Sequence, residues 1–234
     1  MHCASFFAEK YMKKISTVIF DVDGTLLNTE QLWGEAWQMI ADRYDCPSFR
    51  HDYVTGISGK QLEKVLKEHT PDIPDEQREK MLKEARETGM SLIREHVQAL
   101  PGVMETLQEL KKDGYRLAAA TSTPRSLTME RLAKTDLLPW FEEMICGDEV
   151  SAKKPDPEIY VKIMAKMHVS AAETAVIEDT SFGVEAAWRA GCDVIMVPSV
   201  NPASQADRQR AVKTVSGMSP ALAEIRTLYA PAGQ

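Results

Sequence analysis

Short apolar segments that end at polar residues constrain the fold of this chain more than any other feature. The clearest is residues 15–20 (ISTVIF), a run rich in β-branched side chains that stops at Asp21. A run this short and this apolar is typical of a strand buried on both faces of a parallel sheet. Similar runs recur at residues 116–120, 174–177 and 193–197, with a weaker candidate at residues 143–146.

Helical patterns separate these predicted strands, at residues 103–112, 126–134, 157–167 and 183–190. Alternation of strands and helices is typical of βαβ units. The sequence therefore predicts an α/β fold with a doubly wound, Rossmann-like parallel sheet as its core. A closing helix is expected at residues 219–229, with Ser219 as its N-cap and Pro220 at its first position.

The alternation is interrupted once, between about residues 29 and 97. This stretch contains no convincing strand, only charged segments with helical periodicity at residues 30–44, 60–69 and 75–97. We therefore predict an α-helical cap domain at residues 29–97, inserted into a core domain formed by residues 15–28 and 98–234. Residues 1–14 form an N-terminal extension, and Met12 is an alternative start of the protein.

Charge and cysteine content exclude several classes of protein. The 234 residues include 28 Lys and Arg and 35 Asp and Glu, a net charge of −7. An acidic chain repels phosphate backbones, so we expect no nucleic-acid partner. No apolar run approaches the roughly 18 residues of a membrane span, and the four cysteines lack metal-ligand spacing. We expect a cytoplasmic protein without a membrane partner, and the sequence does not predict its oligomeric state.

Polar residues follow the predicted strands, where ligands of an open α/β sheet bind. They are Asp21 and Asp23, Thr121 and Ser122, Lys154, and Glu178 with Asp179. If the chain stays extended past residue 20, Asp21 and Asp23 point the same way, and two such carboxylates repel unless a cation lies between them. An all-oxygen cluster suits Mg²⁺. The sequence thus predicts a magnesium site next to a site for an anion.

Each of these residues also has a structural interpretation. Asp23-Gly24 is a common turn, and Thr121 alone fits a helix cap. Glu178-Asp179 fits a helix N-cap, a role that Thr180 or Ser181 could equally take. A lysine such as Lys154 is usually solvated. All of these residues follow predicted strands, and this shared position favours a functional site over four separate structural roles.

The four motifs together resemble those of haloacid-dehalogenase-superfamily phosphatases, in the subfamily with a helical cap between its first and second motifs. Asp21-Val22-Asp23-Gly24-Thr25 matches the first motif and Thr121 the second, Lys154 in Lys-Pro-Asp-Pro-Glu matches the third, and Glu178-Asp179 matches the fourth. The resemblance runs from about residue 15 to the C-terminal region. It implies Mg²⁺-dependent hydrolysis of a phosphate ester. We expect the substrate to be a small phosphorylated metabolite, a hexose or deoxyhexose phosphate, because an enclosed site leaves little room for a macromolecule.

The resemblance also implies a role for each matching residue. Asp21 would be the nucleophile that forms an aspartyl-phosphate, and Asp23 the general acid and base. Mg²⁺ would be held by the Asp21 carboxylate, the Asp23 backbone carbonyl, and Glu178 or Asp179. The phosphoryl oxygens would be bound by Thr121, Ser122 and Lys154.

The main alternative is a β-phosphoglucomutase-like mutase, since the Glu-Asp form of the fourth motif also occurs there. Mutases carry a histidine early in the first cap helix and an arginine in the cap loop, and these positions hold Trp33 and Gly59 here. Lys60 could replace the arginine, so Trp33 and Lys60 are candidate substrate contacts in the cap. Trp33 equally fits the cap core.

Two further alternatives come from other classes of protein. One is a receiver-type signalling module, whose acceptor aspartate follows the third strand rather than the first and which lacks a cap. The other is a non-catalytic binding protein, which an assay for phosphatase activity with and without Mg²⁺ would separate from an enzyme.

Overall fold

A six-stranded parallel sheet forms the centre of the structure, a computed structural model that describes residues 12–56 and 60–232. The strand order is β4-β3-β2-β5-β6-β7, and every neighbouring pair is parallel. The strands are β2 (Thr17–Phe20), β3 (Arg116–Ala120), β4 (Glu143–Ile145), β5 (Thr174–Glu178), β6 (Asp193–Met196) and β7 (Lys213–Thr214). This confirms the predicted doubly wound α/β fold. All four residues of β2 are buried, as its apolar sequence requires.

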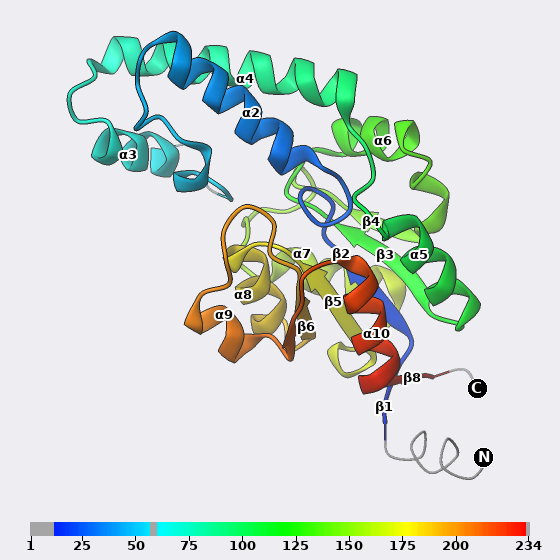
Figure 1. Cartoon of the computed structure of the whole chain (residues 1–234). Coiled ribbons are helices and arrows are strands. Elements are labelled where there is room, and N and C mark those ends of the chain that lie inside the picture. The colour runs from blue at the N-terminus through cyan, green and yellow to red at the C-terminus, as the bar shows by residue number, and fades with distance from the viewer. Residues whose placement is uncertain (1–11, 57–59, 233–234) are drawn as a thin grey trace. The chain divides into compact units, whose positions relative to one another are not determined.

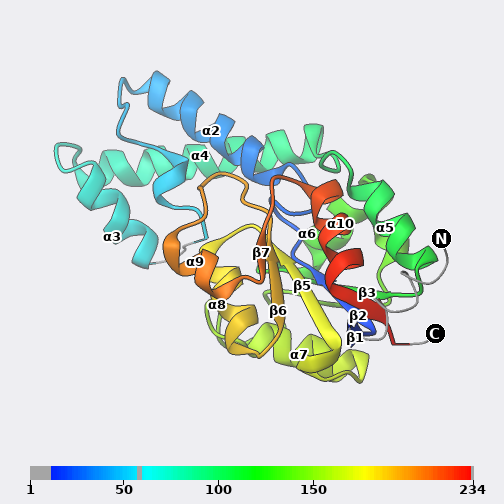
Figure 2. The ribbon, with the colours of Figure 1, turned by 60° about the horizontal axis from the view of Figure 1, so that its bottom comes forward.

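Helices cover both faces of this sheet (Figures 1 and 2). Their bounds are α5 (Val103–Lys112), α6 (Arg125–Lys134), α7 (Glu158–Met167), α8 (Ser181–Arg189), α9 (Gln205–Arg210) and α10 (Met218–Leu228). On one face α7 and α8 pack through Ile163 and Val184 onto strand residues such as Val176. On the other face α5 and α10 pack against each other. Within the described residues, no helix combines the length and apolar character needed to cross a bilayer.

The predicted first strand is divided at Ser16, which corrects the expectation of one strand over residues 15–20. The N–H of Ser16 donates to the carbonyl of Glu173, and its own carbonyl accepts from Arg116 N–H. Ahead of it, β1 (Lys13–Ile15) leaves the large sheet and pairs in parallel with β8 (Tyr229–Pro231). Both β1 and β8 are short and only partly apolar, so periodicity did not predict them.

The closing helix α10 begins at Met218, and Gly217 is its N-cap residue. The prediction of Ser219 as N-cap and Pro220 as the first helical residue was therefore wrong by two positions. Pro220 becomes the third helical residue, where its missing N–H costs nothing because the first four N–H groups of a helix have no partner within the helix. The Ser219 hydroxyl instead lies against Gly102, where a Cβ would be 2.6 Å away.

A helical segment forms a second compact unit, Leu27–Gln98. Its elements are α2 (Thr29–Arg43), the 3-10 turn η1 (His51–Tyr53), α3 (Lys60–His69) and α4 (Asp75–His96). Helices α2 and α4 pack along each other. Trp37 stacks on Phe49 with ring centroids 4.4 Å apart, at the centre of a core that also includes Ile40 and Leu66.

The chain leaves the first unit and returns to it at neighbouring points. Asn28 N–H donates to the Gln98 carbonyl (3.1 Å), and the Asn28 side chain accepts from Gln98 N–H (2.8 Å). Leu26 precedes the helical unit and Leu100 follows it, and the N–H of Leu100 donates to the carbonyl of Leu26 (2.8 Å). The two connecting segments are thus hydrogen-bonded side by side.

Candidate active site

The strand order reverses direction at β2, and this reversal locates the candidate site. From β2 the chain continues to β3 and β4 on one side, and β5, β6 and β7 lie on the other. Ligands of doubly wound sheets bind beyond the carboxyl ends of the strands at such a switch point. Asp21 follows β2 there, and its N–H donates to the carbonyl of Ile177 in β5 at 3.0 Å. Glu178, the last residue of β5, therefore lies beside it.

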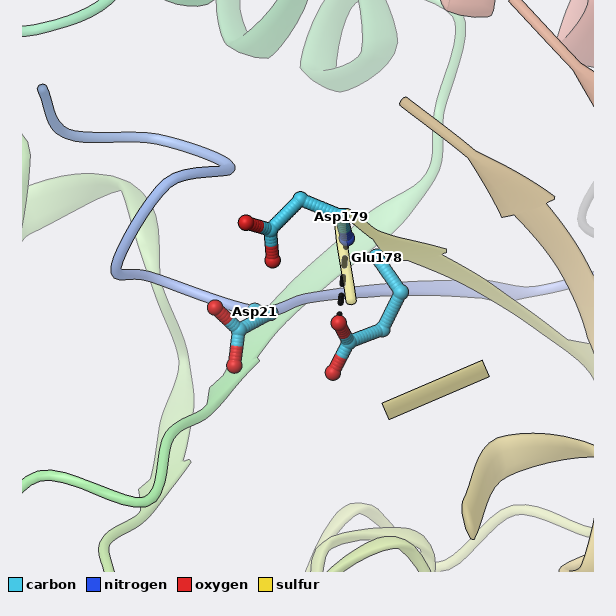
Figure 3. A group of neighbouring side chains, drawn as sticks. All are labelled: Asp21, Glu178 and Asp179. Carbon is cyan, nitrogen blue, oxygen red and sulfur yellow. Dashed lines mark hydrogen bonds between the residues drawn. The ribbon is translucent and has the colours of Figure 1, made fainter. Parts of the chain in front are cut away.

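Three carboxylates meet at this point. Asp21, Glu178 and Asp179 each offer an oxygen, and these atoms lie within 4.8 Å of one another. All three residues are buried. Figure 3 shows the Asp21 carboxylate next to those of Glu178 and Asp179, which come from the end of β5. Such a dense group of negative charge away from water is unfavourable without positive charge nearby.

Lys154 supplies that charge. Its Nζ donates to Asp21 Oδ1 and to Glu178 Oε1, each at 2.6 Å, and to the Ala120 carbonyl at 3.2 Å. Only 6% of its side chain is exposed, so it is not the solvated lysine that surface statistics favour. The loop before it is held by Glu158, which accepts from the N–H groups of Ser151 and Ala152. Lys162 and these two N–H groups lower the pKa of Glu158 to about 2.

Glu178 is fully buried, and both of its carboxylate oxygens accept hydrogen bonds. Oε1 accepts from Tyr160 OH (2.6 Å) as well as from Lys154, and Oε2 accepts from the N–H groups of Asp179 (3.0 Å) and Thr180 (3.3 Å). Gly183 in α8 makes room for this carboxylate, since a Cβ there would lie 2.0 Å from Glu178 Cδ. Thr180 is the N-cap of α8, so the N-cap role considered above for Glu178-Asp179 belongs to Thr180.

Burial and charge determine the protonation of this cluster. Burial raises the pKa of Asp21 well above its usual range; Lys154 opposes this effect, while Glu178 adds to it. Burial alone would lower the pKa of Lys154, but Asp21 and Glu178 raise it, so the ammonium stays charged. Burial and the Glu178 charge raise the pKa of Tyr160 well above 10. Tyr160 is therefore a neutral phenol that donates to Glu178.

Asp179 is oriented by two hydroxyl groups. Ser199 Oγ donates to Asp179 Oδ2 at 2.5 Å, and Thr25 Oγ1 lies 3.3 Å from Oδ1. Ser199 follows β6, and Thr25 belongs to the first motif. Two segments on either side of β5 thus hold this carboxylate toward Asp21 and Glu178.

Asp23 makes its own set of hydrogen bonds beside the three clustered carboxylates, and its charge raises the pKa of Asp21 further. Its Oδ2 accepts from Thr121 Oγ1 (3.0 Å) and Thr123 Oγ1 (2.7 Å), and its Oδ1 accepts from Arg131 Nη1 (2.7 Å). These three donors to Asp23 were not expected from the alternation of side chains after residue 20. Ser122, between the two threonines, is exposed.

Comparison with known proteins identifies the family. Residues 18–197 match the family described as haloacid dehalogenase-like hydrolase. The chain belongs to this family. A phosphorylated carbohydrates phosphatase from Thermotoga maritima is 35% identical over 193 residues, which cover 80% of this chain and 88% of the relative. A phosphoglycolate phosphatase from Nitrosospira multiformis is 28% identical over 189 residues, covering 79% and 83%.

One solved structure is similar to most of this chain. The crystal structure of a Thermotoga maritima protein provisionally described as a β-phosphoglucomutase is 32% identical, with a TM-score of 0.72, and the match covers 91% of this chain and 99% of that one. These findings confirm the resemblance drawn from the four motifs and the expectation of a hydrolase of phosphate esters. The receiver-type alternative is set aside by the family match.

The two residues that the resemblance singles out in the cap lie in the helical unit. Trp33 in α2 covers Gly89 in α4, where a Cβ would lie 2.2 Å from its ring. It is partly buried and packs against the core of that unit. Lys60 is the first residue of α3. Its side chain, like Gly59, lies outside the described part of the structure, so its suggested role stays a prediction.

Sequence reasoning missed several residues that shape the site. Gly183 lies five residues after Glu178 and Tyr160 six after Lys154, so a helix following each motif carries the supporting residue. Such fixed spacings could have suggested them. Nothing in the sequence pointed to Arg131, a buried residue of α6, or to Ser199 in the loop after β6.

Proposed function

We propose that this haloacid dehalogenase-like hydrolase is a Mg²⁺-dependent phosphatase of small phosphorylated carbohydrates that works through an aspartyl-phosphate on Asp21. The observation that carries the proposal is the position of the Asp21 carboxylate. It lies at the switch point of the sheet, beside a buried lysine cation and two further acids. A carboxylate held there has the surroundings that phosphoryl transfer requires, since positioning and charge stabilisation provide most of the catalysis.

The donor set fits Mg²⁺. Asp21, Glu178 and Asp179 offer carboxylate oxygens alone, without a nitrogen or sulfur ligand, and hard divalent cations prefer such sets. Mg²⁺ would be held by Asp21 and by Glu178 or Asp179, together with the Asp23 backbone carbonyl. The bound cation would neutralise the clustered charge, keep Asp21 ionised and stabilise the negative charge on the phosphoryl group.

In the first step Asp21 takes the phosphoryl group from the substrate. A carboxylate oxygen of Asp21 attacks phosphorus, and the bond between phosphorus and the ester oxygen breaks. Asp23 gives a proton to that oxygen, so the carbohydrate leaves as an alcohol. Lys154, 2.6 Å from Asp21 Oδ1, provides a fixed positive charge beside the forming aspartyl-phosphate. The family resemblance implies Thr121 and Ser122 as donors to the phosphoryl oxygens; the Thr121 hydroxyl, which donates to Asp23 Oδ2 in this structure, would exchange that partner for a phosphoryl oxygen.

In the second step water releases the phosphate. Asp23, now without its proton, takes a proton from the attacking water as the water oxygen bonds to phosphorus. The bond between phosphorus and Asp21 breaks, which yields inorganic phosphate. Asp21 and Asp23 return to their starting protonation states, so one Asp23 carboxyl group serves both steps.

The names of two relatives support the proposed substrate class. The Thermotoga relative is named as a phosphatase of phosphorylated carbohydrates, and the Nitrosospira relative as a phosphatase of phosphoglycolate, also a small molecule. The helical unit Leu27–Gln98 serves in this proposal as the cap, with Trp33 and Lys60 as its candidate substrate contacts. A hexose or deoxyhexose monophosphate is the expected substrate.

A mutase is the second candidate, because the Thermotoga structure is provisionally described as one. A mutase must recognise a second phosphate through cap groups, and the resemblance expects a histidine at the position of Trp33. An indole ring packed over Gly89 offers no cation at that point. We therefore favour phosphate release over isomerisation.

The test is phosphate release by purified protein from a panel of glucose 6-phosphate, 2-deoxyglucose 6-phosphate, mannose 6-phosphate, ribose 5-phosphate and glycerol phosphate. We expect turnover of at least one sugar monophosphate with Mg²⁺, and none in excess chelator or for Asp21→Asn. Asp136→Asn is the matched control, since Asp136 is exposed and its left-handed backbone suits asparagine. A coupled assay with β-glucose 1-phosphate and a trace of glucose 1,6-bisphosphate tests the mutase, and isomerisation faster than phosphate release would refute the proposal.

A further inference from the structure

A buried ion pair joins α6 to the first motif. Arg131 Nη1 donates to Asp23 Oδ1 at 2.7 Å, and the two side chains are only 7% and 18% exposed. Arg131 lies ten residues after Thr121 and is not part of any of the four motifs. Its guanidinium is nevertheless the one charged group that donates to the Asp23 carboxylate among the described residues.

Three donors together determine how the Asp23 carboxylate is oriented. Oδ2 accepts two hydroxyl groups, from Thr121 and Thr123, and Oδ1 accepts from Arg131 on the other side. A carboxylate oxygen accepts about two hydrogen bonds. Oδ2 is therefore fully used, whereas Oδ1 keeps one lone pair among the contacts of the described residues. Oδ1 is thus the oxygen left to exchange a proton with a reacting group.

Stability alone does not account for this ion pair. A buried ion pair is often no more stabilising than apolar residues of the same volume, because both charges lose their hydration. What the pair does provide is a fixed orientation of the carboxylate. Proton transfer demands this, since an error of about 1 Å in the position of a reacting group can cost roughly a hundredfold in rate.

We propose that Arg131, acting with Thr121 and Thr123, is a positioning residue that holds the Asp23 carboxylate so that Oδ1 delivers the proton to the leaving oxygen. This inference rests on the function proposed above. It has a consequence that a merely structural role lacks. Loss of Arg131 should lower kcat/KM most for substrates whose leaving group must be protonated. Only protonation of the leaving group depends on Oδ1.

The experiment compares two phosphate esters. A sugar phosphate expels an alkoxide that must be protonated, whereas 4-nitrophenyl phosphate expels a stable phenolate that needs no proton. For each we measure kcat/KM, which reports the steps up to cleavage of the ester bond. In Arg131→Gln we expect kcat/KM to fall about a hundredfold for the fastest sugar monophosphate of the panel. For 4-nitrophenyl phosphate we expect a fall of less than about fivefold, because acid catalysis contributes little there.

Further variants separate positioning from folding. Thr123→Val removes a hydroxyl that donates to Oδ2 and should shift the ratio of the two kcat/KM values in the same direction, by a smaller factor. Arg131→Lys keeps the charge without the planar fork and should restore part of the ratio. Arg125→Gln is the matched control, because Arg125 lies in the same helix but its side chain bonds to Glu149. Its ratio should equal that of the parent.

Two outcomes would overturn the inference. One is a folded Arg131→Gln that loses activity equally on both esters, which would assign Arg131 a structural role only. The other is an unchanged ratio in Thr123→Val, which decides the matter if Arg131→Gln does not fold. A parent protein that hydrolyses neither ester would instead refute the proposed function, and the inference with it, so the two failures are distinguishable.

Discussion

Gly183→Ala tests whether the Glu178 carboxylate must occupy its observed position. A Cβ at residue 183 would lie 2.0 Å from Glu178 Cδ and Oε1, and 2.1 Å from Oε2. Nonbonded carbon atoms approach to about 3.5 Å, so the carboxylate would have to retreat by roughly 1.5 Å. A shift of this size exceeds what the two 2.6 Å hydrogen bonds from Lys154 and Tyr160 to Oε1 can absorb, so their present geometry would be lost.

The expected effects follow from this displacement. Overpacking of a buried site costs about 1–3 kcal/mol of the free energy of unfolding. The displaced carboxylate should lower kcat/KM by about a hundredfold or more and raise the Mg²⁺ concentration needed for half-maximal rate. Helix propensity alone predicts the opposite, because alanine is favoured over glycine in a helix by roughly 0.5–1 kcal/mol. The sign of the stability change therefore tests the structural argument.

The assay combines urea denaturation followed by circular dichroism with phosphate release at increasing Mg²⁺. Gly34→Ala is the matched control, since Gly34 also lies in a helix and a Cβ there meets no atom within 4 Å. It should stabilise the protein by about 0.5–1 kcal/mol and leave kcat/KM unchanged. A Gly183→Ala protein that is as stable as the parent, or within about threefold of its activity, would refute the reasoning.

Three further changes probe the same cluster. Asp21→Asn should abolish phosphate release without lowering the thermal midpoint measured in chelator, because it removes one of three clustered negative charges; a clear fall of that midpoint would contradict this. Lys154→Met should cost about 3–5 kcal/mol in urea denaturation with chelator, as it leaves buried carboxylates without their cation, and Mg²⁺ should restore part of the loss. Glu158 has a pKa of about 2 against an ordinary 4.5, so the stability that it adds is present above pH 4.5 and is lost as the pH falls toward 2. The difference in thermal midpoint between the parent and Glu158→Gln should therefore shrink over that pH range, and a constant difference would contradict the assignment.

The sequence predicted the parts of the fold that local patterns determine. The expected bounds of β3, α5 and α3 agree with the structure to the residue, because each is an uninterrupted apolar or helical pattern between polar or turn residues. Strand β7 has two residues and no apolar run, so no local sequence pattern predicted it. The β1–β8 pair depends on contact between residues more than two hundred positions apart, such as Lys13 and Tyr229, which periodicity cannot reveal.

The candidate site, like the fold, could be predicted from the sequence only in part. Strand ends and topology were enough to expect Asp21 near Glu178, because the carboxyl ends of neighbouring parallel strands share an edge. Side-chain orientation was not accessible in this way. The Asp23 carboxylate accepts hydrogen bonds from Thr121, Thr123 and Arg131, which its spacing from Asp21 does not predict. The orientation of Asp23 depends on a buried arginine of α6, and no spacing in the sequence predicts that contact.

The hydrogen bond between Leu26 and Leu100 has a consequence for how such a chain can be remodelled. A backbone hydrogen bond of 2.8 Å, from the N–H of Leu100 to the carbonyl of Leu26, already joins these two residues of the core. The entropy of closing any loop between them is therefore largely provided by the folded core, and it grows only slowly with loop length. Segments of very different size should be interchangeable at this junction. A short glycine linker from residue 26 to residue 99 should leave a core that folds by itself, to which other insertions could be grafted.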